Sequence, residues 1–363
     1  MKNSKITDTT HNKDFKMEEL LEQLSAVPWI KDYIECVPPE FLEMIFGAAG
    51  ISVRAINGTV IEAEFKNPGG VAEKSWKYYV SEPYPGIRVM SGNITGLVKL
   101  IGIGKKMPEG ETSVIHYCVK GRCEILTKDG MYAFMEPGVL CLESHKHKEK
   151  NFNFFGEDYE GVEIGFDLDK FDEDQINYLQ SLGVDIMELK ERYERDADYY
   201  IGNVTELLKA SIMELDGLMK NDSVDNLTIF LSALRIINQI KTGNVQTDTN
   251  KFYLTKGQRK IVSEVHDQLV SSPDTDVTVE ALAKKYGISP ISLNKYFSIM
   301  YGDTVHKYLQ SYRMDYAAKL LADTYKSIAD IALDVGYENQ GKFATLFKRI
   351  FGMSPLEYRR CKK

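Results

Sequence analysis

Long apolar runs are missing from this sequence. No stretch of its 363 residues comes near the roughly 18 consecutive apolar residues that a membrane-spanning helix needs. The first fifteen residues are polar and lack the apolar run of a signal peptide. We therefore expect a cytoplasmic protein that does not bind or cross a membrane.

Groupings of residues that would bind a metal or catalyse a reaction are also missing. The chain has five cysteines, an odd number, and no two of them form a Cys-x-x-Cys pair. This argues against a secreted disulfide framework and against a structural zinc site. No nucleophile with an adjacent base and no triad of metal ligands appears. We expect no enzyme activity, no catalytic residue, no cofactor and no metal.

Acidic residues are comparatively scarce in the last third of the chain. Residues 251–363 hold 18 Lys and Arg against 12 Asp and Glu, a net charge of +6, whereas the other residues hold 27 against 41, a net charge of −14. A basic C-terminal part on an acidic body is typical of a nucleic-acid contact surface. Chance segregation of solvated surface charges is the alternative.

Two segments in this basic part, 278–302 and 327–352, read alike. Each begins with a short helix of periodic apolar residues, turns at a glycine, restarts at a polar residue and ends in a second helix that closes on glycine. This pattern predicts a helix-turn-helix, written twice. Residues 304–322 between them predict a helix of about 19 residues, roughly 28 Å long. The second helix of a helix-turn-helix is the one that reads DNA. Two such reading helices can enter successive major-groove segments when they lie about one duplex turn, roughly 34 Å, apart.

Local signals mark where these helices begin and turn. The expected N-caps are Thr255, Thr278, Ser289, Ser327 and either Glu338 or Asn339. Pro290 follows its cap at the first helical position, where a missing N–H costs nothing. Gly287 and Gly336 give the two turns their backbone freedom. The residues expected to face the core from the second helix of each unit are Leu293, Phe297, Met300, Phe343, Phe347 and Ile350.

The N-terminal part predicts strands between two groups of helices. Residues 16–26 and 39–49 read as short amphipathic helices. Strands at 51–56 and 59–65 flank Asn57-Gly58, a strong hairpin signal. An irregular Gly- and Pro-rich interval at 67–86 precedes strand-like residues 87–103. Residues 113–143 predict four strands separated by turns at Lys120-Gly121, Asp129-Gly130 and Pro137-Gly138, and residues 151–155 and 161–166 predict two more. This spacing favours a sandwich or small barrel of the jelly-roll type.

Helical periodicity follows the strands. One apolar stripe comprises Val204, Leu207, Leu208, Ile212, Leu215, Leu218 and Met219, and a second comprises Leu227, Phe230, Leu231, Leu234, Ile237 and Ile240. Two such neighbours should pair as a helical hairpin that covers the β domain or also forms a homodimer interface, which we prefer. We expect four parts: an N-terminal helical and β-rich domain (1–200), the dimerising hairpin (201–241), a linker (242–254) and the DNA-binding domain (255–363).

The turn at Lys120-Gly121 raises a question about two cysteines. If it is a two-residue hairpin loop, Cys118 faces Cys123 with Cα atoms about 4.5 to 5.5 Å apart, within disulfide reach. Oxidation could then regulate the sensor. The alternative is a pair of small, reduced core residues in a reducing cytosol.

The C-terminal part resembles a known family through a run of more than forty residues. The stretch RMDYAAKLLADTYKSIADIALDVGYENQGKFATLFKRIFGMSPLEYRR, residues 313–360, is similar to the DNA-binding domain of the AraC/XylS family of bacterial transcription regulators. The resemblance implies an α+β multidomain protein: a cupin-like or jelly-roll-like N-terminal domain and an all-α C-terminal domain with two helix-turn-helix units. Its expected partners are double-stranded promoter or operator DNA, a small-molecule effector and, for an activator, RNA polymerase.

The same resemblance implies which side chains contact DNA. Base-edge contacts fall on Ile291, Asn294, Lys295, Gln340, Gly341 and Thr345, and backbone contacts fall on Ser289, Asn339, Lys348, Arg349 and Arg359. The residue types partly agree, because Asn and Gln can bond adenine, Lys can donate to guanine, and apolar groups can meet a thymine methyl. The second unit departs from the family, since Gly341 has no side chain and Thr345 replaces a frequent basic residue. That helix is therefore expected to contact mainly the backbone.

The N-terminal strands resemble the cupin-like ligand domains of this family less specifically. The matching residues are His116, Gly121, Asp129-Gly130, Pro137-Gly138 and either His145 or His147. In His145-x-His147-x-Glu149 the glutamate comes too early for a metal-binding cupin, so an exposed polar turn is expected there. In a cupin-like fold the effector would sit in the mouth of the barrel, near His116, Tyr117, Tyr132 and Phe134.

Three functions remain open on the sequence alone. The first is a transcription regulator whose DNA binding responds to an effector, which we prefer. The second is a DNA-binding regulator without an effector. The third is a cupin-type metalloenzyme with an appended DNA-binding domain, which the missing ligand triad disfavours.

Overall fold

The strand-rich part of the chain and the two helix-turn-helix segments lie in separate units. The computed structural model describes residues 51–56, 60–66, 75–93, 112–127, 130–144, 152–155, 158–167, 170–188, 191, 199–246, 252–275 and 277–362. The N-terminal unit comprises Met1–Asp129 and Ala133–Phe252, and the C-terminal unit comprises Gly130–Tyr132 and Tyr253–Lys363. The first unit contributes most of the strands and the second most of the helices.

The larger sheet of the N-terminal unit is antiparallel throughout. Its strands stand in the order β1-β2-β3-β4-β10-β5-β8-β11-β12, and every adjacent pair runs antiparallel. Because β10 inserts between β4 and β5, the centre of the sheet depends on pairing between distant parts of the chain. The strands are β1 (Ile51–Ile56), β2 (Val60–Lys66), β3 (Ser75–Tyr84), β4 (Ile87–Asn93), β5 (Thr112–Lys120), β8 (Val139–Ser144), β10 (Glu160–Asp167), β11 (Tyr199–Val204) and β12 (Val245–Gln246).

A smaller sheet contains β6 (Cys123–Leu126), which lies between β7 (Tyr132–Met135) and β9 (Phe152–Phe154). Ring contacts connect it to the larger sheet through Tyr159, whose ring centroid lies 4.9 Å from that of Phe154 and 5.6 Å from that of His116 on β5. The structure therefore shows a β-rich N-terminal region in an α+β protein. Membership in the jelly-roll class stays a prediction.

The strand predictions are mostly confirmed, with one wrong hairpin. β1 and β2 pair across residues 57–59, with Ile56 opposite Val60. The glycine-punctuated stretch gives the four strands β5 to β8. However, β5 pairs with β8 and β10, whereas β6 pairs with β9. The hairpin considered at Lys120-Gly121 therefore does not form, and Cys118 and Cys123 are buried in different sheets.

Strand β3 occupies an interval that the sequence predicts to be irregular. Pro83 lies inside the strand, but the register between β3 and β4 shifts between Ser81 and Tyr84. A bulge of this kind accepts a proline because no ladder hydrogen bond is required of it. Helix α5 (Glu173–Ser181) and strand β11 were not expected either. The predicted helices 16–26 and 39–49 lie outside the described residues.

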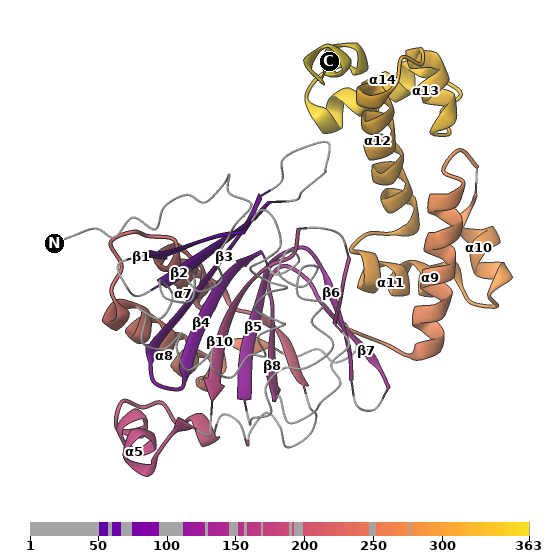
Figure 1. The fold of residues 1–363 in the computed structure, drawn as a ribbon. Helices are drawn as coiled ribbons and strands as arrows, with labels where there is room; N and C mark the ends of the chain where they lie inside the picture. Colours follow the sequence, from indigo (N-terminus) through magenta and orange to yellow (C-terminus); the bar gives the residue numbers. More distant parts are fainter. Residues whose placement is uncertain are drawn as a thin grey trace, which may run out of the picture. The chain divides into compact units, whose positions relative to one another are not determined.

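Helices α7 (Glu206–Met219) and α8 (Asn226–Lys241) cover one face of the larger sheet (Figure 1). Their buried residues share one core with alternate residues of β4, β5, β8 and β10. A polar contact adds to this packing: the hydroxyl of Ser91 on β4 donates to the carboxylate of Asp216 on α7, which also accepts from Lys220 at 2.7 Å. Burial of the apolar faces accounts for the two predicted stripes.

Three leucines of those stripes point outward instead. Leu207 on α7 and Leu227 and Leu231 on α8 are 61%, 63% and 54% exposed. Glu214 and Arg235 form an ion pair between the two helices. The predicted stripes were thus too wide: the core-facing part of each is buried, and the leucines at its edge remain on the surface.

The C-terminal unit is helical, and its predicted helix starts are confirmed. Thr255 caps α9 (Lys256–Ser271) through a capping box with Gln258. Thr278, Ser289, Ser327 and Asn339 cap the next helices with their side-chain oxygens, as expected for these residue types. The helices are α10 (Val279–Lys285), α11 (Pro290–Tyr301), α12 (Val305–Asp323), α13 (Ile328–Asp334), α14 (Gln340–Phe351) and α15 (Pro355–Lys362), after the short strand β13 (Tyr253–Leu254).

The segment 242–254, predicted as a linker, contains the short strands β12 and β13. None of the helices in the described ranges combines the length and apolar character that crossing a membrane requires.

Candidate nucleic-acid interface

The first helix-turn-helix consists of α10 and α11. Ala283 is fully buried at the corner between them, where a larger side chain would separate the two helices. Gly287 adopts a positive φ of 67° in the turn, which explains why glycine is needed there. Leu293, Phe297 and Met300 of α11 are buried, as predicted. The opposite side of α11 is left to contact a ligand.

Three predicted DNA contacts lie on the outward side of α11: two of these side chains are exposed, and the third accepts a hydrogen bond within the protein. Ile291 is 82% exposed, and Lys295 is exposed as well. Asn294 is half-buried, and its Oδ1 accepts the backbone N–H of Val305 at 3.1 Å. Thr304, the N-cap of α12, makes no capping hydrogen bond with its own side chain. Asn294 therefore acts as the capping acceptor of α12.

The second helix-turn-helix consists of α13 and α14. Phe343 and Phe347 of α14 are buried. Ile350 was expected to be buried as well, but it is 44% exposed. That prediction was wrong because α14 faces the core of α12 and α13 with Phe343, Leu346 and Phe347, which leaves Ile350 on the exposed side of the helix.

The predicted contact residues on the outward side of α14 are uncharged in its first turns and basic in its last turn. Gln340, Gly341 and Thr345 are exposed. The Thr345 hydroxyl donates to the Gly341 carbonyl at 2.9 Å, so its methyl group is the part left to face outward. Lys348 and Arg349 lie in the last turn and form no ion pair within the described ranges. Basic side chains at this end also interact favourably with the helix dipole.

Three of the predicted backbone-contacting residues have roles within the fold. Ser289 and Asn339 are N-caps, whose side-chain oxygens accept the N–H groups of Ser292 and Lys342 at 3.0 and 2.9 Å. Arg359 is half-buried, and its Nη2 donates to the carbonyl of Lys326 at 2.6 Å. A cap hydroxyl can still donate to a phosphate, but the Arg359 side chain primarily attaches α15 to the loop before α13.

The four predicted effector residues do not converge on one place. Tyr117 belongs to the core under α7 and α8. His116, its neighbour in β5, projects from the opposite face because strand side chains alternate. Phe134 on β7 is buried and stacks near Phe155, with ring centroids 6.1 Å apart. Tyr132 belongs to the C-terminal unit, where the guanidinium carbon of Arg259 lies over its ring, 4.9 Å from the ring centroid.

His116 is the centre of a polar cluster that the sequence did not reveal. Its Nδ1 lies 2.6 Å from the Glu163 carboxylate and its Nε2 lies 2.5 Å from the Tyr159 hydroxyl. Glu163 sits opposite His116 in the β10–β5 register. The alternation of β10 places Glu163 away from the helices, but its pairing with β5 cannot be read locally. Burial raises the pKa of the nearby Cys118 thiol to about 12 and that of Tyr159 well above its usual value.

The raised pKa of Cys118 argues against the hypothesis that oxidation of this cysteine regulates the N-terminal domain. A thiol with a pKa of about 12 is almost fully protonated at neutral pH, and the thiolate is the reactive form. Together with the separation of β5 and β6 into different sheets, this favours Cys118 and Cys123 as reduced core residues.

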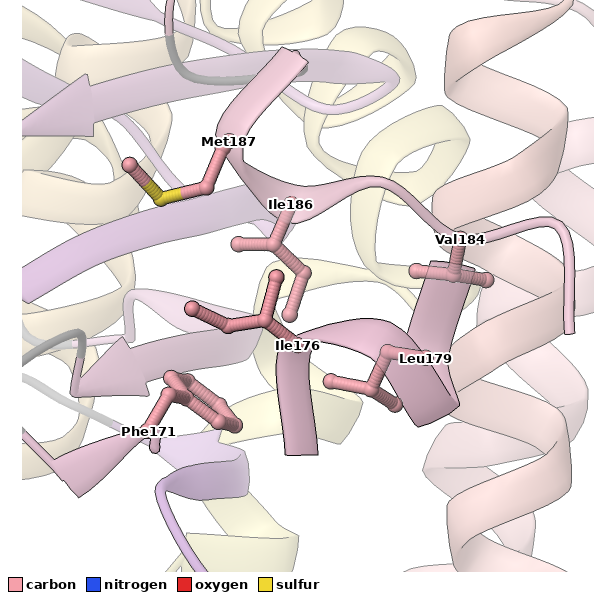
Figure 2. A pocket seen from close by; sticks show the side chains of 6 residues that line it. All are labelled: Phe171, Ile176, Leu179, Val184, Ile186 and Met187. Atoms are coloured by element: carbon pink, nitrogen blue, oxygen red, sulfur yellow. The ribbon is translucent and has the colours of Figure 1, made fainter. Parts of the chain in front are cut away.

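A pocket of about 270 Å³, open solvent included, lies beside α5. Six apolar side chains line it: Phe171, Ile176, Leu179, Val184, Ile186 and Met187 (Figure 2). All six come from one short stretch, and Leu179, Val184 and Ile186 also belong to the main core. Ligand sites combine apolar walls with a few convergent polar groups. This pocket has no such group, so we interpret it as local packing of α5.

Within the described ranges, no three or more His, Cys, Asp or Glu side chains gather where they could hold a metal ion. The segment with His145, His147 and Glu149 lies outside those ranges.

Comparison with known proteins finds a family model that lies within the C-terminal unit, together with several relatives. A family model described as "Helix-turn-helix domain" matches residues 282–361. The regulatory protein SoxS of Escherichia coli (strain K12) is 32% identical over 101 residues, which are 28% of this chain and 94% of SoxS. The HTH-type transcriptional regulator AlkR of Acinetobacter baylyi is 30% identical over 135 residues, 37% of this chain and 44% of AlkR.

Solved structures match part of this chain as well. The C-terminal domain of AraT, a response regulator from Geobacillus stearothermophilus, is 33% identical; the match covers 30% of this chain and 87% of that chain, with a TM-score of 0.26.

The role of Asn294 can be tested by substitution. Asn294→Ala should lower the free energy of unfolding of the C-terminal unit by about 1 kcal/mol, because the N–H of Val305 loses its acceptor. Ile291→Ala, at an exposed position of the same helix, should change it by less than roughly 0.5 kcal/mol. Urea unfolding followed by circular dichroism measures both. An unchanged stability of Asn294→Ala, with loss of preference at one base pair, would show that its amide reads DNA instead.

Proposed function

The chain belongs to the AraC/XylS family of bacterial transcription regulators, and on this premise we propose that an effector bound by its N-terminal unit controls its binding to a specific promoter sequence. DNA binding and transcription regulation come with the family. Effector control, the residues that read the sequence and dimerisation are our proposals. If binding activates transcription, RNA polymerase is a further partner.

The observation that carries the DNA-binding proposal is the exposed face of each reading helix. Ile291 and Lys295 on α11 and Gln340 on α14 are exposed. In the described part of the chain, none of the three uses its side chain in an intramolecular hydrogen bond or ion pair. An apolar group, a donor and an amide are chemically suited to thymine, guanine and adenine edges. We assign base contacts to these three and to the methyl group of Thr345.

The other predicted contacts are proposed to position the protein on DNA. Gly341 lets the backbone of α14 approach the groove closely. Lys348 and Arg349 are exposed and basic, and Ser289 and Asn339 stand at helix N-termini, where backbone N–H groups favour phosphate. Asn294 and Arg359 support the interface through their bonds to Val305 and Lys326.

Two substitutions separate base contacts from phosphate contacts. Lys295→Ala should lower affinity for the preferred duplex by about 1 kcal/mol or more and leave random duplexes nearly unchanged. Arg349→Ala should weaken both and reduce the salt slope by about 1. The preferred duplex comes from selection out of a random library, and fluorescence anisotropy at several salt concentrations measures binding. Equal losses from both variants on both duplexes would refute the assignment.

We propose that the effector binds on the face of the larger sheet opposite α7 and α8, in a cupin-like N-terminal domain. His116, Glu163 and Tyr159 supply hydrogen-bonding groups there, and the His116 side chain is 14% exposed. Of the four residues predicted from sequence, His116 is the one we retain as a direct contact. Tyr117 supports the strand from the core side.

Effector binding is testable without knowing the molecule. A ligand at about 100 times its Kd adds roughly 2.7 kcal/mol to stability, which should raise the Tm of the full-length chain by about 5–10 °C. A thermal-shift screen with a library of small metabolites, together with native mass spectrometry of the purified protein, looks for it. His116→Ala should abolish the shift, whereas Tyr178→Ala on α5 should keep it. A flat screen with no copurified molecule would favour a regulator without an effector.

We further propose that α7 and α8 carry a homodimer interface. Leu227 and Leu231 are four residues apart and share one side of α8. Leu207 and Met213 are the exposed large apolar residues of α7. Exposed apolar surface on a helix pair that already covers its own sheet favours a second partner, and a symmetric dimer is the commonest arrangement.

Placing a charge on this surface tests the dimer. Leu231→Glu should convert a dimer into a monomer, because an unpaired carboxylate in an apolar interface is costly. Leu356→Glu, an equally exposed leucine in the C-terminal unit, should leave the dimer intact. Sedimentation equilibrium of the full-length variants measures the change. A wild-type monomer, or a Leu231→Glu dimer of unchanged affinity, would contradict the proposal.

A further inference from the structure

The side chain of Arg313, in the middle of α12, donates hydrogen bonds to the loop that leads into the first helix-turn-helix. Its Nε donates to the carbonyl of Pro273 at 2.7 Å, and its Nη2 donates to the carbonyl of Thr275 at 3.2 Å. These carbonyls belong to the loop between α9 and α10. The guanidinium fork thus holds the segment that leads into the first unit.

The same guanidinium contacts the turn of the second helix-turn-helix. Its Cζ lies 5.7 Å from the centroid of the Tyr337 ring. A Cβ at Gly336 would come within 2.7 Å of Arg313 Nη2 and 3.0 Å of the Asp274 carbonyl, and Gly336 has a φ of +78°. Glycine is therefore required at this turn for two reasons, its backbone conformation and the close approach of Arg313. The loop of one unit and the turn of the other meet at one side chain.

Apolar packing of α12 is divided between the two helix groups: Val305 and Leu309 are buried in its first half, where the Tyr308 ring also lies edge-on to Phe297 of α11 at 5.3 Å. The core of the second helix-turn-helix begins at Met314 of α12 and continues through α13 and α14. Among the described residues it includes no member of α9, α10 or α11. Figure 1 shows α12 running between the α9–α11 group and the α13–α15 group. Arg313 lies between these two packed halves of α12, so its contacts add to the rigidity of the helix in restraining the angle between the two helix-turn-helix segments.

We propose that Arg313 is the positioning residue that fixes the distance and angle between the reading helices α11 and α14, and so sets the spacing of the two DNA segments that the protein accepts. This rests on the proposed reading of DNA by both helices. With α12 about 28 Å long and successive major-groove segments roughly 34 Å apart, a small rotation at the junction changes the spacing that fits. Lysine replaces the fork only in part, since its compact ammonium keeps the charge but lacks the planar arrangement of donors.

The test compares spacing preference rather than affinity alone. Full-length wild type, Arg313→Gln, Arg313→Lys and Lys319→Gln are each used to select duplexes from a random library. Lys319 is an exposed lysine on the same helix for which the described structure shows no ion pair, so it controls for lost charge. Circular dichroism checks the helix content of each variant.

We expect wild type and Lys319→Gln to select two segments at one spacing. Arg313→Gln should select the same two segments at several spacings, with about tenfold weaker binding to the wild-type site. The penalty for inserting one base pair between the segments should shrink in the same variant. Arg313→Lys should lie between the two, because it keeps the charge and at most one of the carbonyl bonds.

Two outcomes overturn the proposal. One is a single, wild-type spacing for both Arg313 variants. The other is a loss of base preference within a segment instead of between segments. If Arg313→Gln does not fold, the spacing profile of Arg313→Lys decides alone. A wild-type selection with only one segment would instead show that one helix reads DNA, which contradicts the proposed function itself.

Discussion

The attachment of helix α12 is the constraint on which the DNA-binding surface depends. Each helix-turn-helix is a pair of helices, too small to bury a large core of its own. The two cores are joined through α12, which is held at its start by Asn294 and in its middle by Arg313. Both contacts use side chains that accept or donate at backbone groups, so they fix geometry rather than add much apolar burial.

Sequence reasoning succeeded where the determining interaction is local. The caps bond an N–H two or three residues away, so their positions follow from residue type and the periodicity after them. The glycines at the turns follow from backbone conformation in the same way. These two signals located the starts of α9 to α14 within about a residue: the start of α12, for example, was predicted at residue 304 and lies at Val305. Helix α15 was not predicted. The strands β1, β2 and β5 to β8 were found from alternation and turn residues, which are local signals as well.

Sequence reasoning failed where the partner is distant in the chain. β10 inserts between β4 and β5, and nothing near Glu163 indicates that it pairs with His116, 47 residues earlier. The Lys120-Gly121 turn has the residues of a hairpin, yet it sends β5 and β6 into different sheets. Asn294 shows the same limit inside a helix, because its outward position on α11 suggested a base contact while its acceptor role depends on Val305.

A side chain that already forms a hydrogen bond within the protein is less available to contact a base. This reduces the number of residues that can determine sequence preference. Asn294, Thr345 and Arg359 each donate or accept within the protein. Breaking such a bond to form one with DNA exchanges one hydrogen bond for another and gains little. Sequence preference is then left to a few unengaged side chains on α11 and the first turn of α14. With few base contacts available, discrimination depends more strongly on holding both helices at one spacing, since a misplaced second helix loses its contacts without any mismatch in the first.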